Sequence, residues 1–328
     1  MPSPFAIDAD DVRSAARMLA GIAVRTPLLE YAVLNELAGR RVLVKFEGAQ
    51  HTGSFKFRGA YNRVARIEET ARAGGVVAWS SGNHAQGVAA AAKLLGMRAT
   101  IVMPSDAPAI KQENTKALGA EIVLYDRYTE SREDISAALA AKLGATFVPP
   151  FNDPFVIAGQ GTVGLEILQQ AEAAGAVLGQ VLVCCGGGGL TAGVATAIKD
   201  ADASIDVYSV EPSAYDDTAR SLVSGRYELV AAGAYSICDA LLTPSPGEMT
   251  FPINQALLSG GLAVTDEQVK GAMRFAFEKL KLVVEPGGAV ALAAVLYGVA
   301  PRTERATAIV VSGSNVDPAL YASILSER

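Results

Sequence analysis

The hydrophobic positions of this chain fall into short apolar runs that alternate with longer amphipathic segments. Runs of four or five apolar residues, rich in valine, isoleucine and leucine, are typical of buried strands. Apolar positions spaced three and four residues apart are typical of helices. The pattern predicts strands at 42–46, 76–79, 100–103, 121–124, 146–148, 181–185, 207–210 and 308–311. It predicts helices at about 8–19, 55–64, 85–95, 105–118, 131–143, 160–173, from 190, at 265–280 and at 287–297.

This alternation of strand and helix indicates an α/β fold, with parallel sheets covered by helices. A glycine pair at 74–75 and a proline pair at 149–150 bracket one group of strand–helix units. The pattern allows two consecutive domains. It also allows a small domain at 73–152, inserted between the two parts, 1–72 and 153–328, of a larger domain.

Composition narrows the classes of function. The 328 residues carry a net charge of −6 and contain no block of lysine and arginine, so neither nucleic acid nor an anionic membrane is an expected partner. The longest apolar stretch, 287–300, is shorter than the roughly 18 residues that a membrane span needs. The first residues show no secretion signal, which favours the cytoplasm.

Cysteine and histidine usage excludes further chemistry. Cys184, Cys185 and Cys238 are odd in number and lack the usual metal spacing, which is typical of reduced thiols. Metal ligation by the adjacent pair is the alternative. His51 and His84 are the two histidines of the chain, which argues against a histidine zinc site or a Ser-His-Asp triad.

One stretch, 45–60, carries the most specific signal. A polar loop follows the strand at 42–46, and helical spacing begins near Phe55. Lys56 therefore lies at a strand–loop–helix junction, between two phenylalanines. A buried lysine is costly unless it is neutral, paired or covalently used. Because a helix start binds anions, this amine suits an imine with a phosphorylated aldehyde cofactor. A snorkelling surface lysine is the alternative.

A run of four glycines stands between a predicted buried strand and a helix. The run is Gly186, Gly187, Gly188 and Gly189. Backbone without side chains can wrap an anion, and a helix start adds partial positive charge. A tight turn and a dinucleotide site are the alternatives, although Thr191 leaves the Gly-x-Gly-x-x-Gly spacing incomplete. We expect a phosphate monoester here, because Lys56 needs such a partner.

A polar segment, Ser-Ser-Gly-Asn-His-Ala-Gln-Gly from residue 80, follows the strand at 76–79. It faces the carboxyl end of a parallel sheet, where α/β proteins bind ligands. Asn83 can hydrogen-bond a phenolic oxygen, and N–H groups from Ser81 to His84 can hold a carboxylate. A capped helix with a solvent-facing histidine is the alternative.

Taken together, these motifs resemble the serine/threonine dehydratase family of pyridoxal-phosphate enzymes, which includes threonine dehydratases, serine racemases and hydroxyaspartate dehydratases. The resemblance is carried by Thr-Gly-Ser-Phe-Lys-Phe-Arg-Gly-Ala at 52–60, the segment from Ser80, the glycine run and Ser-Gly-Ser-Asn at 312–315. It implies the tryptophan synthase β-like fold (fold type II), with two domains of open twisted parallel sheets and helices on both faces. It also supports the inserted small domain.

The resemblance implies roles for individual residues. Lys56 would carry pyridoxal 5'-phosphate as an imine beside Phe55, and the glycine run would hold the phosphate. Asn83 would contact the phenolic oxygen, and the Ser312 hydroxyl would reach the pyridine nitrogen. Because that partner is neutral, β-elimination should compete well. The expected substrate-binding residues are Ser54, Ser81, Gly82 and His84.

An acidic turn after the strand at 207–210 resembles the divalent-cation loop of serine racemases. Glu211, the Tyr215 carbonyl and Asp217 would be the ligands, and hard oxygens of this kind suit Mg²⁺ or Ca²⁺. We expect such a cation to be structural. By spacing alone, a solvated acidic turn is the alternative.

The resulting hypothesis is a cytoplasmic lyase, expected to be a homodimer, that acts on a small amino acid. Lys56 would take the Cα proton of L-threonine or L-serine, the β-hydroxyl would leave, and a 2-oxo acid and ammonia would form. The chain ends at Arg328, which leaves no room for the regulatory domain of biosynthetic threonine dehydratases, so isoleucine feedback is not expected.

Three alternatives stay open. Ser81 stands where dehydratases of the family commonly have alanine, and where serine racemases and some hydroxyaspartate dehydratases have serine. It is the residue that distinguishes a racemase, in which Ser81 is a second acid or base, from a lyase, in which it caps the helix or binds the carboxylate. A hydroxyaspartate dehydratase would need a cation for the distal carboxylate, and Arg58 and Arg132 are the candidates. A nonenzymatic amino-acid-binding module would not need Lys56.

Overall fold

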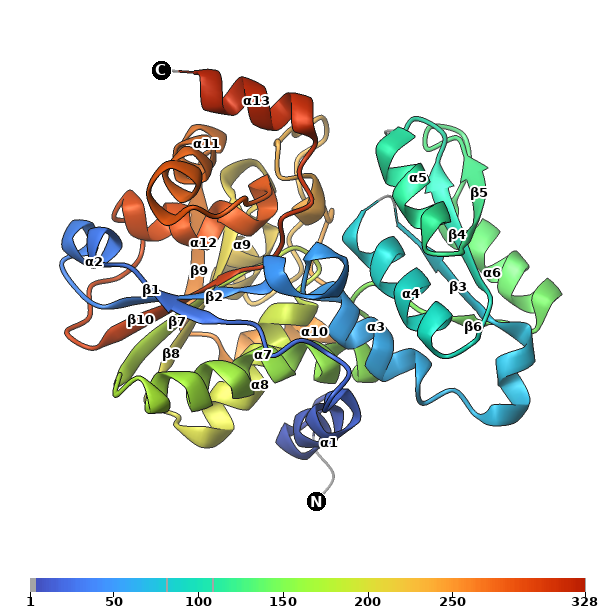
Figure 1. Cartoon of the computed structure of the whole chain (residues 1–328), viewed down its shortest axis with the longest axis horizontal. Helices are drawn as coiled ribbons and strands as arrows, with labels where there is room; N and C mark the ends of the chain where they lie inside the picture. Colours follow the sequence, from blue (N-terminus) through green and yellow to red (C-terminus); the bar gives the residue numbers. More distant parts are fainter. Residues whose placement is uncertain (1–3, 81, 108, 328) are drawn as a thin grey trace.

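The computed structural model describes residues 4–80, 82–107 and 109–327, and it contains two twisted sheets (Figure 1). The six-stranded sheet runs in the order β1 (Leu28–Glu30), β2 (Val42–Phe46), β10 (Ala306–Val311), β7 (Leu178–Cys184), β8 (Asp206–Pro212), β9 (Gly260–Val264). The four-stranded sheet runs β5 (Glu121–Tyr125), β4 (Ala99–Pro104), β3 (Val76–Trp79), β6 (Thr146–Phe147). Within the described chain the pairings are parallel, except that β1 and β2 are antiparallel.

Helices cover both faces of each sheet. Around the larger sheet lie α1 (Ala9–Leu19), α2 (Ala32–Ala38), α7 (Pro154–Ala173), α8 (Gly189–Ala201), α9 (Asp217–Ser224), α10 (Thr250–Leu257), α11 (Asp266–Phe275), α12 (Pro286–Leu296) and α13 (Pro318–Ser326). In Figure 1, α11 and α12 lie on one side of it and α7 and α8 on the other. Around the smaller sheet lie α4 (Asn83–Leu94), α5 (Ala109–Ala117) and α6 (Arg132–Leu143), and α3 (Lys56–Val64) lies between the two sheets.

The central strands are buried on both sides, which explains their continuous apolar runs. All six residues of β10 are buried, and they join β7 and the alanine-rich α12 in the main hydrophobic core. The predicted α/β fold, with parallel sheets and helices on both faces, is therefore confirmed. Strands β3 to β6 come from residues 76–147, and the larger sheet is built from segments on either side of that range. Among the described residues, no helix combines the length and apolarity that crossing a bilayer requires.

Helix α7 and strand β9 differ from the sequence prediction. Helix α7 begins at Pro154 rather than near residue 160, and the Asp153 side chain caps it by accepting from the N–H of Val156 at 2.9 Å. Gly159, in the part that was missed, allows close helix contact: a Cβ there would lie 2.6 Å from the Cα of Gly59. Strand β9 was not predicted, and it starts with two glycines, which weaken a strand pattern.

Candidate active site

A cavity of about 720 Å³ opens between the two sheets, at the carboxyl ends of β3, β7 and β10. Segments far apart in the sequence meet there, as expected for ligand sites of α/β folds. The predicted site residues that line it are Phe55, Lys56, Gly82, Asn83, His84, Gly186, Gly187, Gly188, Gly189 and Ser312. Ser54 is not among the described lining residues, and Ser81 lies outside the residues that the structure describes.

Lys56 is the first residue of α3, and its amine enters the cavity. Its Nζ donates a hydrogen bond to the carbonyl oxygen of Pro150 at 3.0 Å and lies 5.3 Å from the centre of the Phe55 ring. Burial lowers the pKa of Lys56 to about 8, against the opposing effects of Cys184 and Glu285. A neutral amine, which can attack a carbonyl carbon or accept a proton, is thus accessible near neutral pH.

The loop before Lys56 is tied to the end of β10. The N–H of Phe55 donates to the carbonyl of Ser312 at 3.1 Å, and Ser54 forms an antiparallel bridge with Gly313. Ser54 is buried, and its hydroxyl has no hydrogen-bond partner within the described chain. The bridge explains how the lysine junction and the Ser312 segment, over 250 residues apart in the sequence, face one cavity.

The glycine run links β7 to α8 and forms a cradle of backbone. Gly188 has φ +85°, and a Cβ there would lie 2.6 Å from Nδ2 of Asn254 and 2.8 Å from the hydroxyl of Thr250. The Thr250 hydroxyl also donates to the carbonyl of Gly187 at 2.6 Å, which holds the loop in place. The backbone without side chains and the start of α8 make an anion site, so this cradle fits a phosphate group.

Asn83 lies at the start of α4, and its amide is oriented by two neighbours. Its Nδ2 donates to Oε1 of Glu285 at 2.7 Å, and its Oδ1 accepts from Nδ2 of Asn315 at 2.8 Å. An amide nitrogen carries two hydrogens, so one remains to donate to a phenolic oxygen in the cavity.

Glu285 is a cavity residue that sequence reasoning missed. It precedes α12 and is 3% exposed, and burial raises the pKa of its carboxyl to about 8, with a further increase from Asp239. The available signal was a lone acid before Pro286 at a predicted helix start. The consequence is a carboxyl group beside Asn83 that is largely protonated, and therefore uncharged, at neutral pH.

His84 is buried, so the alternative of a solvent-facing histidine is wrong. Its Nε2 lies 2.9 Å from the carbonyl oxygen of Val148. Burial, aided by the charge of Lys56, lowers the pKa of His84 to about 3, so the ring is neutral. Since a carbonyl only accepts, Nε2 carries the proton, and Nδ1 is left as an acceptor with no partner in the described chain.

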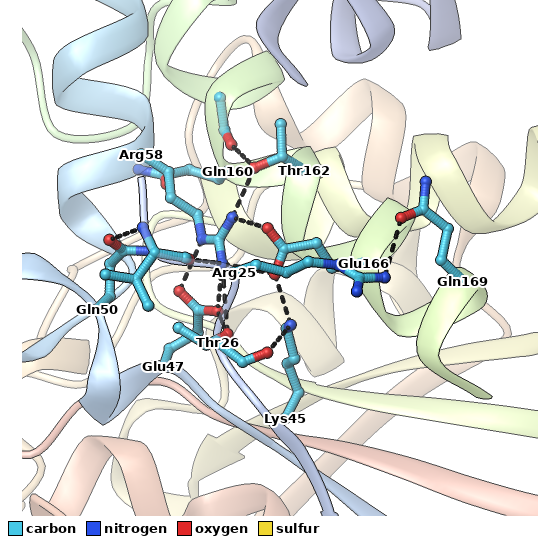
Figure 2. Close-up of polar contacts among 12 residues, drawn as sticks. Arg25, Thr26, Lys45, Glu47, Gln50, Arg58, Gln160, Thr162, Glu166 and Gln169 are labelled. Atoms are coloured by element: carbon cyan, nitrogen blue, oxygen red, sulfur yellow. Dashed lines mark hydrogen bonds and ion pairs between the residues drawn. The ribbon is translucent and has the colours of Figure 1, made fainter. Parts of the chain in front are cut away.

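The two arginines considered for a distal carboxylate occupy different places. Arg132 lines the cavity, with its guanidinium carbon 3.8 Å from the centre of the Trp79 ring and its Nε donating to Glu133 at 2.8 Å. Arg58 is 1% exposed and is bound by the carboxylates of Glu47, which is buried, and Glu166, which is partly buried (Figure 2). Arg132 is therefore within reach of a ligand in the cavity, and Arg58 is not.

The end of β8 and the start of α9 carry two buried carboxylates, Glu211 and Asp217. Glu211 accepts hydrogen bonds from the N–H groups of Thr218 at 3.0 Å and Ala219 at 2.8 Å. Asp217, which begins α9, is 2% exposed, and its Oδ2 has no partner in the described residues. Burial raises the pKa of Glu211 to about 8 and that of Asp217 to about 7. Tyr215 lies between them in the turn, whose buried carboxylates do not fit a solvated acidic loop.

No cluster of three or more histidine, cysteine, aspartate or glutamate side chains suited to a metal occurs in the described part of the chain. The expected ligand set differs from such a cluster, because it combines two carboxylates with a backbone carbonyl. The unpartnered Oδ2 of Asp217 is the feature that fits a cation there.

Known proteins resemble this chain over most of its length. Residues 19–313 match the family model described as pyridoxal-phosphate dependent enzyme. An L-threo-3-hydroxyaspartate ammonia-lyase of Pseudomonas sp is 44% identical, over 96% of this chain and 97% of that relative. An L-threonine ammonia-lyase of Thermotoga maritima is 40% identical, over 98% of this chain and 79% of that relative.

A solved structure of maize serine racemase has a TM-score of 0.92 at 37% sequence identity, covering 98% of this chain and 97% of that one. The family model spans most of the chain, and the relatives cover nearly all of it. This chain belongs to the family of pyridoxal-phosphate dependent enzymes.

Proposed function

We propose that the protein is a pyridoxal-phosphate-dependent ammonia-lyase that converts a β-hydroxy amino acid, such as L-threonine or L-serine, to a 2-oxo acid and ammonia. The observation that carries this proposal is the partly buried Lys56 amine, with its lowered pKa, in one cavity with the glycine cradle and Asn83. Two of the relatives described above are named ammonia-lyases, which supports the reaction class.

The cavity fits the cofactor in its donor groups. The cradle at 186–189 would hold the phosphate, the free hydrogen of the Asn83 amide would meet the phenolic oxygen, and Ser312 would face the pyridine nitrogen. When bound, the cofactor supplies an electron sink for negative charge at the substrate Cα. The Lys56 amine would hold the cofactor in the absence of substrate.

The freed Lys56 amine then acts as general base and takes the Cα proton. The Cβ–O bond breaks, and the leaving hydroxyl departs as water after it receives a proton, which the Lys56 ammonium can return. Addition of water to the released dehydrated amino acid gives the 2-oxo acid and ammonia. The neutral Ser312 hydroxyl does not force a charge onto the ring, which favours elimination over other fates of the substrate.

The test is a panel of hydroxy amino acids, in both enantiomers, assayed for oxo acid and for inversion at Cα. Oxo acid from L-threonine or L-serine supports the proposal. Inversion without oxo acid would instead support a racemase. If the protein holds no cofactor and turns over none of the panel, the lyase proposal is wrong. The nonenzymatic amino-acid-binding module would then be the alternative that remains.

The racemase alternative depends on Ser81 as a second acid or base, and it stays a prediction from sequence. Removal and return of a proton on opposite faces of Cα needs two groups, and Lys56 serves one face. Loss of D-serine formation in Ser81→Ala, with elimination retained, would support that role.

A second candidate substrate is a hydroxy amino acid with a distal carboxylate, such as 3-hydroxyaspartate. Arg132 favours it, because this guanidinium lines the cavity and stacks on Trp79, which holds the planar fork in place. Lys111 adds a second cation at the wall, although it is paired with Asp239. The 44% identical Pseudomonas relative is named for such a substrate.

Arg132→Ala is expected to lower kcat/KM for 3-hydroxyaspartate by about tenfold to 100-fold, the usual worth of hydrogen bonds to a charged group. The value for L-serine, which lacks a distal carboxylate, should change less than about threefold. Steady-state oxo-acid assays measure both. Arg127→Ala is the matched control, because Arg127 is an arginine of the same connection that pairs with Asp106 outside the cavity. An equal loss for both substrates would contradict the role.

We also propose that Glu211, the Tyr215 carbonyl and Asp217 bind Mg²⁺ or Ca²⁺. Two buried carboxylates with one unpartnered oxygen are costly unless they are protonated or meet a cation. The role is structural, because these residues lie beside α9 and do not line the cavity in the described chain.

Asp217→Asn should weaken Mg²⁺ binding by about tenfold to 100-fold, because hard cations need several charged oxygens. Calorimetric titration and the shift of Tm on adding MgCl₂ to chelator-treated protein measure it. Asp216→Asn is the control, since Asp216 pairs with Arg220 instead. If the chelator changes neither Tm nor activity, and titration shows no heat, the site does not bind a cation.

We further propose a small domain at 73–152 inserted in a large one, a homodimer, and a cytoplasmic location. The two sheets support the division into domains, and the resemblance to the family supports the homodimer. The three free, buried cysteines support the cytoplasmic location. Light scattering of the purified chain tests the dimer.

A further inference from the structure

A cluster of charged side chains lies close to Lys56 in the sequence and the fold, and none of its members lines the cavity (Figure 2 shows the cluster). Its members are Lys45 on β2, Glu47 directly after β2, Arg58 on α3 and Glu166 on α7. Lys45, Glu47 and Arg58 are at most 1% exposed. Two cations and two carboxylates make the set neutral, and none of the steps described above uses it.

Arg58 is the centre of this cluster. Its Nε and one terminal nitrogen donate to the two oxygens of Glu47, both at 2.8 Å. Its two terminal nitrogens donate to the two oxygens of Glu166, at 2.6 and 2.9 Å. Burial opposes the charge of Arg58, yet the two carboxylates raise its pKa above the ordinary value. A guanidinium held by two forks has a fixed position and a fixed plane.

The remaining polar atoms of the cluster are also satisfied. Lys45 donates to Glu166 at 2.6 Å, to the carbonyl of Thr26 at 2.7 Å and to Gln170 at 2.7 Å. The hydroxyl of Thr26 donates to Glu47 at 2.5 Å. Buried ion pairs of this kind add little to stability compared with apolar packing. Their benefit is geometric, since each partner has one allowed position.

The geometry concerns Lys56. Glu47 directly follows β2, and Arg58 lies two residues after Lys56. The two hydrogen bonds between Arg58 and Glu47 therefore join the two ends of the loop that leads to the lysine. Glu166 joins the same point to α7. The tip of Lys56 is held by Pro150, four residues before α7 begins. The backbone of Lys56 and its amine are therefore both held in place relative to α7.

We propose that Arg58, clamped between Glu47 and Glu166, is a positioning residue that sets where the Lys56 amine lies in the cavity. The inference rests on the proposed function, because it gives Lys56 the reacting amine. It assigns Arg58 no contact with substrate or cofactor. Replacement of the fork by a single point charge should let the start of α3 shift and admit water to the amine.

The chain contains a matched control on the same two helices. Arg63, at the other end of α3, pairs with Asp153, the residue that caps α7, with Nε to Oδ2 at 2.7 Å. Both ion pairs therefore join α3 to α7, but only that of Arg58 lies beside the lysine. Arg58→Lys and Arg63→Lys both keep the charge; the first removes the forks to Glu47 and Glu166, and the second removes the single bond to Asp153.

The first measurement is made on the cofactor-free chain and reports Lys56 alone. The pH dependence of acetylation at Lys56, followed by peptide mass spectrometry, gives its pKa, to which His84, Cys184 and Glu285 contribute in all variants alike. In Arg58→Lys the half-point, meaning the pH at which Lys56 is acetylated at half its maximal rate, should rise by about one pH unit towards the ordinary lysine pKa. In Arg63→Lys it should stay at that of the wild type.

The second measurement is turnover of the loaded enzyme. Arg58→Lys should lower kcat by about tenfold to 100-fold, with a smaller change in KM. A misplaced Lys56 amine slows removal of the Cα proton but does not weaken the binding of substrate. Arg63→Lys should leave both constants near wild type. If Arg58→Lys lowers Tm but leaves the Lys56 half-point and kcat unchanged, the cluster serves stability alone and the inference is overturned.

A second variant serves if Arg58→Lys does not fold. Glu166→Gln keeps the shape and replaces one carboxylate of the clamp, to which Arg58 donates at 2.6 and 2.9 Å, by an amide that has a single acceptor oxygen. A rise of the Lys56 half-point in this variant supports the inference, and an unchanged half-point overturns it. Failure of the proposed function is a separate result: wild-type protein that holds no cofactor at Lys56 would contradict the function, whatever the variants do.

Discussion

Lys56→Ala is expected to reduce β-elimination by at least about 10³-fold and to remove the covalent link between protein and cofactor. Loss of a general base alone costs on the order of 10² to 10⁴ in rate, and here the same amine also holds the cofactor. Water has no fixed place from which to take the Cα proton, so it does not replace the lysine. The glycine cradle and Asn83 stay intact, so noncovalent binding of the phosphate should persist.

Three measurements check this result. They are oxo-acid formation from L-threonine and L-serine, visible absorbance of the purified protein, and borohydride trapping followed by peptide mass mapping. Lys93→Ala on α4 is the control, because this lysine is exposed and does not line the cavity within the described chain. Turnover at the wild-type rate, or cofactor trapped on a different lysine, would contradict the assignment of Lys56.

The fold was predictable where the apolar pattern is continuous. Strands such as β7 and β10 are covered on both faces, and their runs of apolar residues therefore predict a buried strand. Prediction failed in β9, whose two leading glycines weaken the pattern, and in the first six residues of α7. Contacts between elements decide such segments, for example that of Gly59 with Gly159, and no local window contains them.

The candidate site shows the same limit. Local spacing indicated Lys56, the glycine run and the segment with Asn83, because each is a strand followed by a polar turn and a helix. Glu285 and the Arg58 cluster were missed or misjudged, because their roles come from partners more than 100 residues away. A sequence shows that Arg58 follows Lys56, but not which side of α3 faces the cavity.

Gly188→Ala should weaken cofactor binding by on the order of 100-fold or more, while the fold persists. Two effects add. The residue has φ +85°, which an alanine adopts only with strain. Its Cβ would also lie 2.6 Å from Asn254 and 2.8 Å from Thr250, so the loop must move. Because Thr250 fixes the neighbouring Gly187 carbonyl, that movement redirects the backbone N–H groups that would face the phosphate.

Gly175→Ala separates strain from the loss of the cradle. Gly175 has φ +61°, and nothing lies within 4 Å of a Cβ placed there, so it carries the backbone strain without any contact near the cavity. Without cofactor, both variants should lose Tm, and Gly188→Ala should lose more because its Cβ also meets Asn254 and Thr250. Titration of cofactor-free protein with pyridoxal phosphate, and separately with inorganic phosphate as competitor, should show weaker binding for Gly188→Ala alone. If the two variants bind the cofactor equally well, the glycine run is a turn and the phosphate is held elsewhere in the cavity.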